Sequence, residues 1–196
     1  MRTPGVTRFL GTDSGEAGAR LSPVQTLESI MFRKIEDFLG SWAYETEATV
    51  KVFQQLTDAS LAQRVYSEGR TLGLIAWHIV RTRPEMGGRT GLKIQGPGED
   101  DPVPPTAEEI SSGFKAAADS LGHEIRTHWG DDDLEEEDDM YGEMWSRGKT
   151  LAALLNHQTH HRGQMTVLMR QAGLTVPGVY GPSLEEWAAY GMPAQE

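Results

Sequence analysis

The chain has 196 residues, enough for one well-buried core, and its length gives little reason to expect two domains. With 38% hydrophobic and 24% charged residues it resembles a water-soluble globular protein, and its formal net charge of −11 opposes binding to nucleic acid. The sequence has no secretory signal, no cysteine and no apolar stretch near the ~20 residues of a membrane span, so we expect a cytoplasmic protein that binds neither membrane nor nucleic acid.

The N-terminal part divides into an arm and the first helix. Residues 1–21 mix Gly, Thr, Arg and Asp without periodicity, which predicts a flexible arm, and the folded domain is expected over 22–196. Ser22, followed by proline, is a typical helix start. Apolar residues then recur at steps of three and four, so we expect one long helix to Leu56, with a bend allowed at Gly40.

Two more helices are expected in the middle of the chain. The second begins at Thr71 and is apolar nearly all round until Pro84, which discourages its continuation. A Gly/Pro-rich connection follows and ends at Thr106. Thr106 and Glu109 form a capping-box pattern for a third helix that reaches about Trp129.

The C-terminal third carries an acidic run and the last helices. Asp131–Asp139 holds eight acidic side chains, and we expect it to be a solvated loop. A fourth helix is expected from Lys149 to Gln171, with Gly173 as its C-cap, and a short fifth helix after Ser183. Because almost no strand pattern is present, the sequence predicts an all-α fold, a four-helix bundle with a short C-terminal helix.

Two histidines of the fourth helix have a spacing suited to metal binding. At 100° per residue, His157 and His161 lie about 60° and about 20° from Leu154, which marks the buried stripe of this helix. Two imidazoles on adjacent turns can hold one ion, and neutral imidazoles buried without partners would be costly. His160 points elsewhere. The pair therefore indicates a divalent metal site.

A third ligand is expected from the second helix, where His78 is the one histidine. A bundle can place this helix beside the fourth, and three histidines leave an open position of the kind found in catalytic rather than structural sites. Gln158 stands where a metalloprotease helix has its glutamate, so peptidase activity is not expected. His123 and His128 have no second ligand pair and are interpreted as ordinary surface or packing residues.

The residues around this pair resemble a known family. Asn156–Gln164, read as NHQTHHRGQ, is similar to the H-x-x-H-H-R-G-Q signature of the DinB family, the damage-inducible or YfiT-like metalloenzymes, and Leu74–Val80 resembles the stretch that supplies its first histidine. The segment Val179–Trp187 is also similar to the end of many members.

The resemblance implies both a fold and a chemistry. It implies an up-down four-helix bundle, often homodimeric, in which His78, His157 and His161 bind zinc, nickel or a similar ion. It also implies a small-molecule reaction, since characterised relatives include thiol-dependent S-transferases and a mycothiol-dependent isomerase. In these relatives the thiolate of a small thiol such as bacillithiol or mycothiol attacks an electrophile. An adjacent cation stabilises this thiolate relative to the protonated thiol.

Three other signature positions flank the buried stripe or oppose it. Arg162 and Gln164 are expected to make structural hydrogen bonds, with support of the metal ligands as the alternative. Gly163 leaves a patch without a side chain, suited to the close approach of another helix, and a dimer is one way to use it.

The sequence leaves three functions open. The leading prediction is a metal-dependent thiol transferase, and a metal-dependent hydrolase that uses water as nucleophile is the alternative. A non-catalytic, stress-responsive metal-binding dimer is the third, in which the ion stabilises the bundle.

Overall fold

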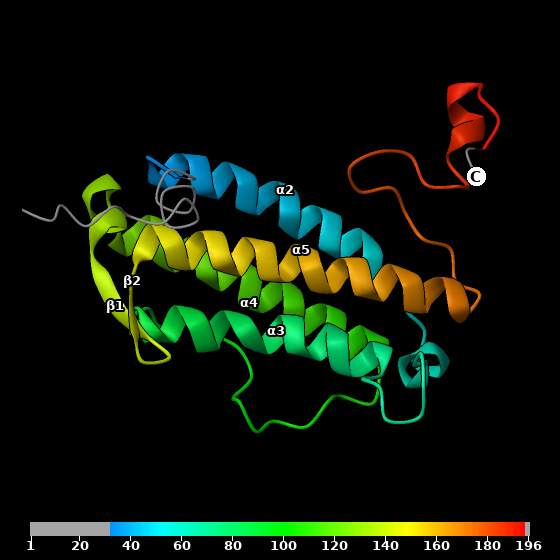
Figure 1. Ribbon diagram of the computed structural model, residues 1–196, viewed down its shortest axis with the longest axis horizontal. Helices are drawn as coiled ribbons and strands as arrows, with labels where there is room; N and C mark the ends of the chain where they lie inside the picture. The colour runs from blue at the N-terminus through cyan, green and yellow to red at the C-terminus, as the bar shows by residue number, and fades with distance from the viewer. Residues whose placement is uncertain (1–31, 195–196) are drawn as a thin grey trace, which may run out of the picture.

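The computed structural model describes residues 32–194, and four long α-helices make up most of this part of the chain (Figure 1). They are α2 (Ile35–Phe53), α3 (Leu72–Arg89), α4 (Ala107–His128) and α5 (Arg147–Gln171). The predicted all-α bundle is thereby confirmed. The predicted arm 1–21 and the helix start at Ser22 lie outside the described residues, so the division into arm and domain stays a prediction.

Helix α2 is shorter than the expected helix because the chain is extended just before it. Lys34 has φ −137° and ψ 148°, so no helix runs through this point, and Leu56 lies beyond the end of α2. The first turn takes its partner from far along the chain, since the backbone N–H of Ile35 donates to Asp131 Oδ1 at 2.9 Å. A contact across 96 residues cannot be found from local periodicity.

Helix α3 continues past Pro84, where the sequence predicted its end. A proline inside a helix costs about 3 kcal/mol. The continuation buries Met86 and brings Gly87 so close to the next segment that a Cβ there would lie 2.7 Å from Cγ1 of Ile94. Burial of one such side chain contributes about 1.5–3 kcal/mol, so tertiary packing offsets the cost of the proline.

The acidic run lies between α4 and α5 with most of its acidic side chains exposed, as predicted, but it is not a loop throughout. It forms a 3-10 turn, η2 (Asp131–Glu135), and enters a two-stranded antiparallel hairpin of β1 (Glu137–Met140) and β2 (Glu143–Ser146). The turn residues Tyr141 and Gly142 have φ of 63° and 88°, the left-handed pair that tight hairpins favour. Arg147 neutralises part of the run through Asp133 and Asp138 at 3.3 and 3.0 Å.

The other helix ends follow their capping residues. Thr106 accepts from the backbone N–H of Glu109 at 3.2 Å before α4, and Ser146 accepts likewise from Lys149 before α5. After α5, Gly173 adopts φ 73°, the predicted C-cap conformation. The short helix expected after Ser183 is a 3-10 turn, η3 (Trp187–Tyr190); another, η1 (Asp58–Ala62), precedes α3.

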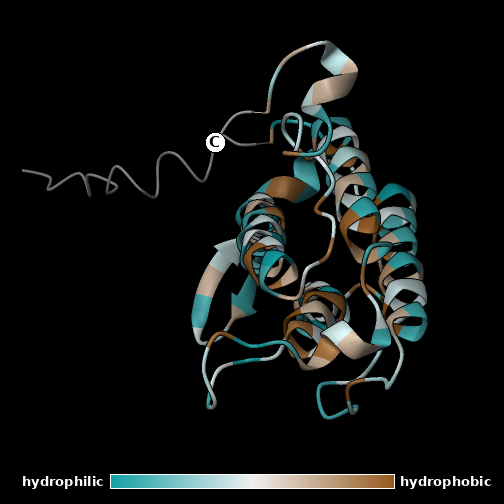
Figure 2. Ribbon diagram, turned by 90° about the vertical axis from the view of Figure 1, so that its right-hand side faces the viewer, coloured by the Kyte–Doolittle hydropathy of each residue, from teal (hydrophilic) through white to brown (hydrophobic). Residues whose placement is uncertain are grey.

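The core lies between the four helices, whose apolar faces meet along the bundle axis (Figure 2). Helix α3 packs against both α4 and α5, and α2 covers the same two helices. Aromatic pairs mark the centre, such as Phe53 and Phe114 with ring centroids 4.9 Å apart. Among residues 32–194, no helix is long and apolar enough to cross a membrane. The packing of α3 on α5 positions the site.

Candidate metal centre

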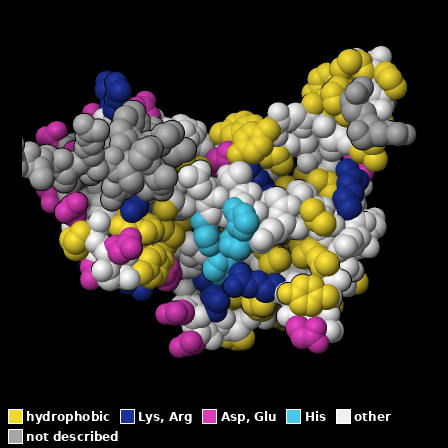
Figure 3. Space-filling view, viewed as in Figure 1, with side chains coloured by type: hydrophobic (Ala, Val, Ile, Leu, Met, Phe, Trp, Pro, Cys, Tyr) yellow, Lys and Arg dark blue, Asp and Glu magenta, His cyan; other side chains and the backbone are white. Residues whose placement is uncertain are grey.

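Three histidine side chains from two helices meet at one point. The Nε2 atom of His157 on α5 lies 3.0 Å from Nε2 of His78 on α3 and 3.1 Å from Nε2 of His161 on α5. One potential ligand atom from each ring lies within 4.8 Å of the others. Histidine side chains reach the surface as a patch on the face of the bundle shown in Figure 3, which we call the open face. The structure thus brings together the three predicted ligands, while ligation itself stays a prediction.

The donor set fits a divalent transition metal. Metal–nitrogen bonds of ~2.0–2.1 Å in a tetrahedral arrangement place two ligand nitrogens about 3.3 Å apart, near the two distances observed. A ring nitrogen carries either a proton or a lone pair, so three Nε2 atoms facing one point cannot all satisfy one another. An ion accepts all three lone pairs at once.

Gln164 orients one of the three rings. The pattern of hydrogen bonds has His161 donate through Nδ1 to Gln164 Oε1 at 2.7 Å, while the Gln164 amide donates to Nε2 of His160 at 3.1 Å. A proton on Nδ1 leaves the Nε2 lone pair of His161 free for an ion. Gln164 is therefore placed to support His161 as a ligand, the alternative that the sequence left open.

The three rings stay neutral over the physiological range. Burial, followed by nearby positive charge, lowers the pKa of His78 and of His157 from 6.5 to about 4. Burial also lowers the pKa of His161. For His78 the contributing charges include the guanidinium groups of Arg70 and Arg81. Neutral imidazoles are the form that binds a metal, so no proton has to be displaced near pH 7.

The histidines lie at the edge of the core rather than inside it. His161 is 6% exposed, whereas His78 and His157 are half-buried. This differs from the expectation that the pair on α5 points into the core, and the 60° offset of His157 from the buried stripe is the reason. One side of the cluster is therefore open to small molecules.

The remaining signature residues face the other way. Arg162 is buried and pairs with Glu45 of α2 at 2.7 Å, and Gln158 donates to Thr49 at 2.9 Å. Gln158 also accepts from the buried guanidinium of Arg83. The predicted structural role of Arg162 is thus confirmed, and Gln158 faces away from the cluster.

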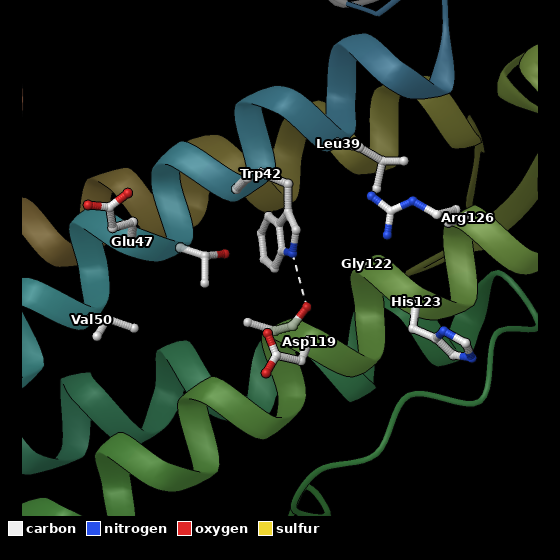
Figure 4. Close-up of a pocket in the computed structure, with 11 residues that line it drawn as sticks. Leu39, Trp42, Glu47, Val50, Asp119, Gly122, His123 and Arg126 are labelled. Carbon is white, nitrogen blue, oxygen red and sulfur yellow. Dashed lines mark hydrogen bonds between the residues drawn. The ribbon is translucent and has the colours of Figure 1, made fainter.

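The two histidines of α4 do not join the centre. His123 is exposed and lines a groove between α2 and α4 together with Arg126 (Figure 4). In that groove Trp42 donates through its indole N–H to the carbonyl of Ala118 at 3.1 Å, which ties the two helices. His128 lies 3.7 Å from Glu124 at the end of α4. Both are surface residues, as predicted.

Sequence reasoning missed the arginines that surround the centre. Arg81 lies three residues after His78 on α3, and Arg70 lies just before the helix, directly ahead of its N-cap Thr71. The spacing of three residues was a usable signal for Arg81, because such residues share a helix face. The position of Arg70 depends on how the loop before α3 folds, which the local sequence does not reveal.

The fold and the site together define a class, a helical-bundle protein with a three-histidine group able to hold a metal ion. The chain belongs to the DinB family, whose family model matches residues 31–196. It is 46% identical over 164 residues to the uncharacterized protein YrdA of Bacillus subtilis (strain 168), which covers 84% of this chain and 98% of that protein.

A solved structure supports the same assignment. A DinB-like protein from Bacillus cereus ATCC 10987 is 48% identical, with a TM-score of 0.74, and the match covers 76% of this chain and 100% of that one. Family membership and the histidine cluster agree with a metal-binding DinB-like protein.

Proposed function

We propose that this protein is a metal-dependent enzyme that transfers the sulfur of a low-molecular-weight thiol to a small electrophile. His78, His157 and His161 would hold the ion, with zinc or nickel as the best candidates because imidazole nitrogens suit both. The observation that carries the proposal is the convergence of three Nε2 atoms on the open face of the bundle.

The open face provides access for a thiol. Three protein ligands leave a position free, and the exposed edges of His78 and His157 adjoin it. The ion, when bound, stabilises a thiolate over a thiol and so supplies a nucleophile near neutral pH. Arg70 and Arg81 add positive charge around His78, which favours an anionic sulfur as well. The cysteine-free chain then needs no nucleophile of its own.

A hydrolase would need a general base beside the ion, and the carboxylates that line the cavity with His78 are those of Glu85 and Glu99. Gln158 faces away, and Glu85 near His78 accepts from Tyr141 and Arg89, each at 2.7 Å. A preformed thiolate needs no such base. Its sulfur forms a bond to the electrophilic carbon, the leaving group departs with the bonding electrons, and the thiol proton passes to solvent.

Two further assignments follow from the family rather than from the geometry. We propose a cytoplasmic homodimer, in which Gly163 on the exposed side of α5 has open space where a side chain would lie. Light scattering of the purified protein tests the assembly, and a Gly163→Arg substitution should lower the dimer fraction if this face is the interface.

The first test is elemental analysis of protein purified without an affinity tag. About one transition-metal ion per chain is expected, with its content falling sharply in His157→Ala. His123→Ala is the matched control, since this exposed histidine lies on α4 outside the cluster, and it should keep the metal. A wild-type protein without metal would refute the proposal.

The second test asks which reaction occurs. Turnover of an electrophile such as monochlorobimane is expected only when bacillithiol, mycothiol or a similar thiol is added, and it should disappear in His157→Ala. Activity without thiol would favour a hydrolase. Loss of thermal stability in His157→Ala, without turnover in any variant, would instead favour a non-catalytic metal-binding protein.

A further inference from the structure

An apolar pocket adjoins the histidine cluster, and none of the three predicted metal ligands lines it. We call it the Tyr66 pocket; it is lined mainly by Val65, Tyr66, Arg70, Ile75, Gln164 and Val167. Its volume is about 430 Å³, within the range of small-molecule sites. Because Gln164 also holds His161, the pocket opens next to the proposed ion.

The wall of the pocket exposes apolar side chains that folding would normally cover. Val65 and Tyr66 are each 64% exposed and Val167 is 56% exposed, although they come from two separate parts of the chain. Apolar side chains that gather around one hollow mark a binding site more often than isolated ones do. In Figure 3 hydrophobic side chains lie beside the histidines, on the side where α5 runs toward its C-terminal end.

The one charged side chain of this pocket is a cation without a counterion. Within the part of the chain that the structure describes, the Arg70 side chain makes no hydrogen bond or ion pair, yet it lies close enough to affect the charge of His78 and His161. The whole chain carries a net charge of −11, so the positive charge of Arg70 in this pocket is a local feature. Lys and Arg side chains border the histidine patch in Figure 3.

We infer that the Tyr66 pocket binds the electrophilic substrate, and that this substrate combines an apolar or aromatic group with one anionic group such as a carboxylate. The apolar group contacts Tyr66 and Val167, and the anion pairs with Arg70. A separate cavity of about 320 Å³, lined by residues with polar groups such as His78, Arg81 and Glu85, leaves room for a thiol. The inference rests on the proposed function only in naming the bound molecule a substrate.

Calorimetric titration with a matched pair of probes tests the inference. The metal-free protein should bind 3-phenylpropanoate about three- to fivefold more tightly than 3-phenylpropan-1-ol, the upper part of the range expected for one exposed charge pair. Arg70→Gln should remove this preference. Val167→Asp should weaken the binding of 3-phenylpropanoate about three- to fivefold, because it adds a like charge to an apolar wall. Metal-loaded protein should show the same ranking.

Two control variants separate the pocket from general charge effects. Arg126→Gln, in the groove between α2 and α4, and Val103→Asp, before α4, change the same residue types outside the pocket and should leave binding unchanged within about twofold. Equal binding of acid and alcohol, equal effects of Arg70→Gln and Arg126→Gln, or no binding of either probe would overturn the inference. Titration of metal-free protein does not depend on the metal or on turnover, so this failure is distinct from a failure of the proposed function.

Discussion

Helix α5 carries two polar pairs of identical spacing that differ by one position along the chain. His157 and His161 face the open side of the bundle, and Gln158 and Arg162 face α2. The second pair lies in a closed network, whereas the histidine Nε2 atoms face only one another. The two faces of one helix thus show how polar groups with partners on other helices differ from polar groups that face mainly one another.

The closed network leaves no charge of the second pair without a partner. Arg162 binds the carboxylate of Glu45 at 2.7 Å and the hydroxyl of Tyr180 at 3.0 Å, and Tyr180 in turn donates to Glu45. Gln158 joins Thr49 and the carbonyl of Glu45, both at 2.9 Å. Such groups can be buried because each has a protein partner.

The histidine cluster has no such set of partners. Within residues 32–194, His161 is the one ring of the three with a hydrogen bond from outside the cluster, through Gln164. Imidazole lone pairs that face one another repel, and a bound cation would remove this repulsion by accepting them. The comparison teaches that one face of α5 joins the buried network of the fold, while the other carries a three-histidine group that could hold an ion.

The largest expected effect is on the closed side. Glu45→Ala leaves the guanidinium of Arg162, whose side chain is 3% exposed, without its counterion. The free energy of unfolding should therefore fall by about 3–5 kcal/mol. Urea unfolding followed by circular dichroism measures the change. Metal content per folded chain should stay at the wild-type value, because Glu45 does not touch the cluster.

A neighbour on the same helix provides the control for this substitution. Glu47 pairs with Lys51 at 3.0 Å, but both side chains are more than half exposed. Glu47→Ala should therefore cost less than about 1 kcal/mol. Equal losses for Glu45→Ala and Glu47→Ala would show that the network around Arg162 is not the structural face of α5.

A smaller effect is expected on the open side. Gln164→Ala removes the partner that fixes the tautomer of His161, which should weaken metal affinity about ten- to hundredfold. The unfolding free energy of the metal-free protein should change by less than about 0.5 kcal/mol, since Gln164 is exposed. Competition with a coloured chelator measures affinity, and Gln171→Ala, at the end of α5, is the control. Unchanged affinity would contradict the support role of Gln164.

The last prediction concerns pH and the metal-free protein. His78 and His157 have folded-state pKa values of about 4 against an ordinary 6.5, because burial disfavours the charged form. The unfolded chain therefore binds more protons between these values, and stability should fall as pH drops from about 6.5 to about 4. Melting temperatures of wild type and His78→Ala across this range measure it. A slope just as steep in His78→Ala would show that this histidine does not contribute.

The sequence located more of the site than of its surroundings. The spacing of His157 and His161 follows from helix geometry alone, and capping residues such as Thr106 and Ser146 start their helices as local rules require. Pro84 gave the wrong helix end because packing of Met86 outweighs a local cost. The hairpin in the acidic run was not predicted, because its acidic side chains meet partners such as Arg147 only in the folded chain.

The sequence by itself determined that the chain forms a helical bundle, that two histidines share one face of the last long helix, and that a third histidine lies on an apolar helix. Periodicity and side-chain chemistry are local properties, so the chain order contains them. Only the tertiary structure decided that α3 packs against α5 with His78 at the right height, that the cluster is open at the edge of the core, and that Arg70 lies beside an apolar pocket. These features depend on contacts between distant residues, which form when apolar burial selects one packing of the helices.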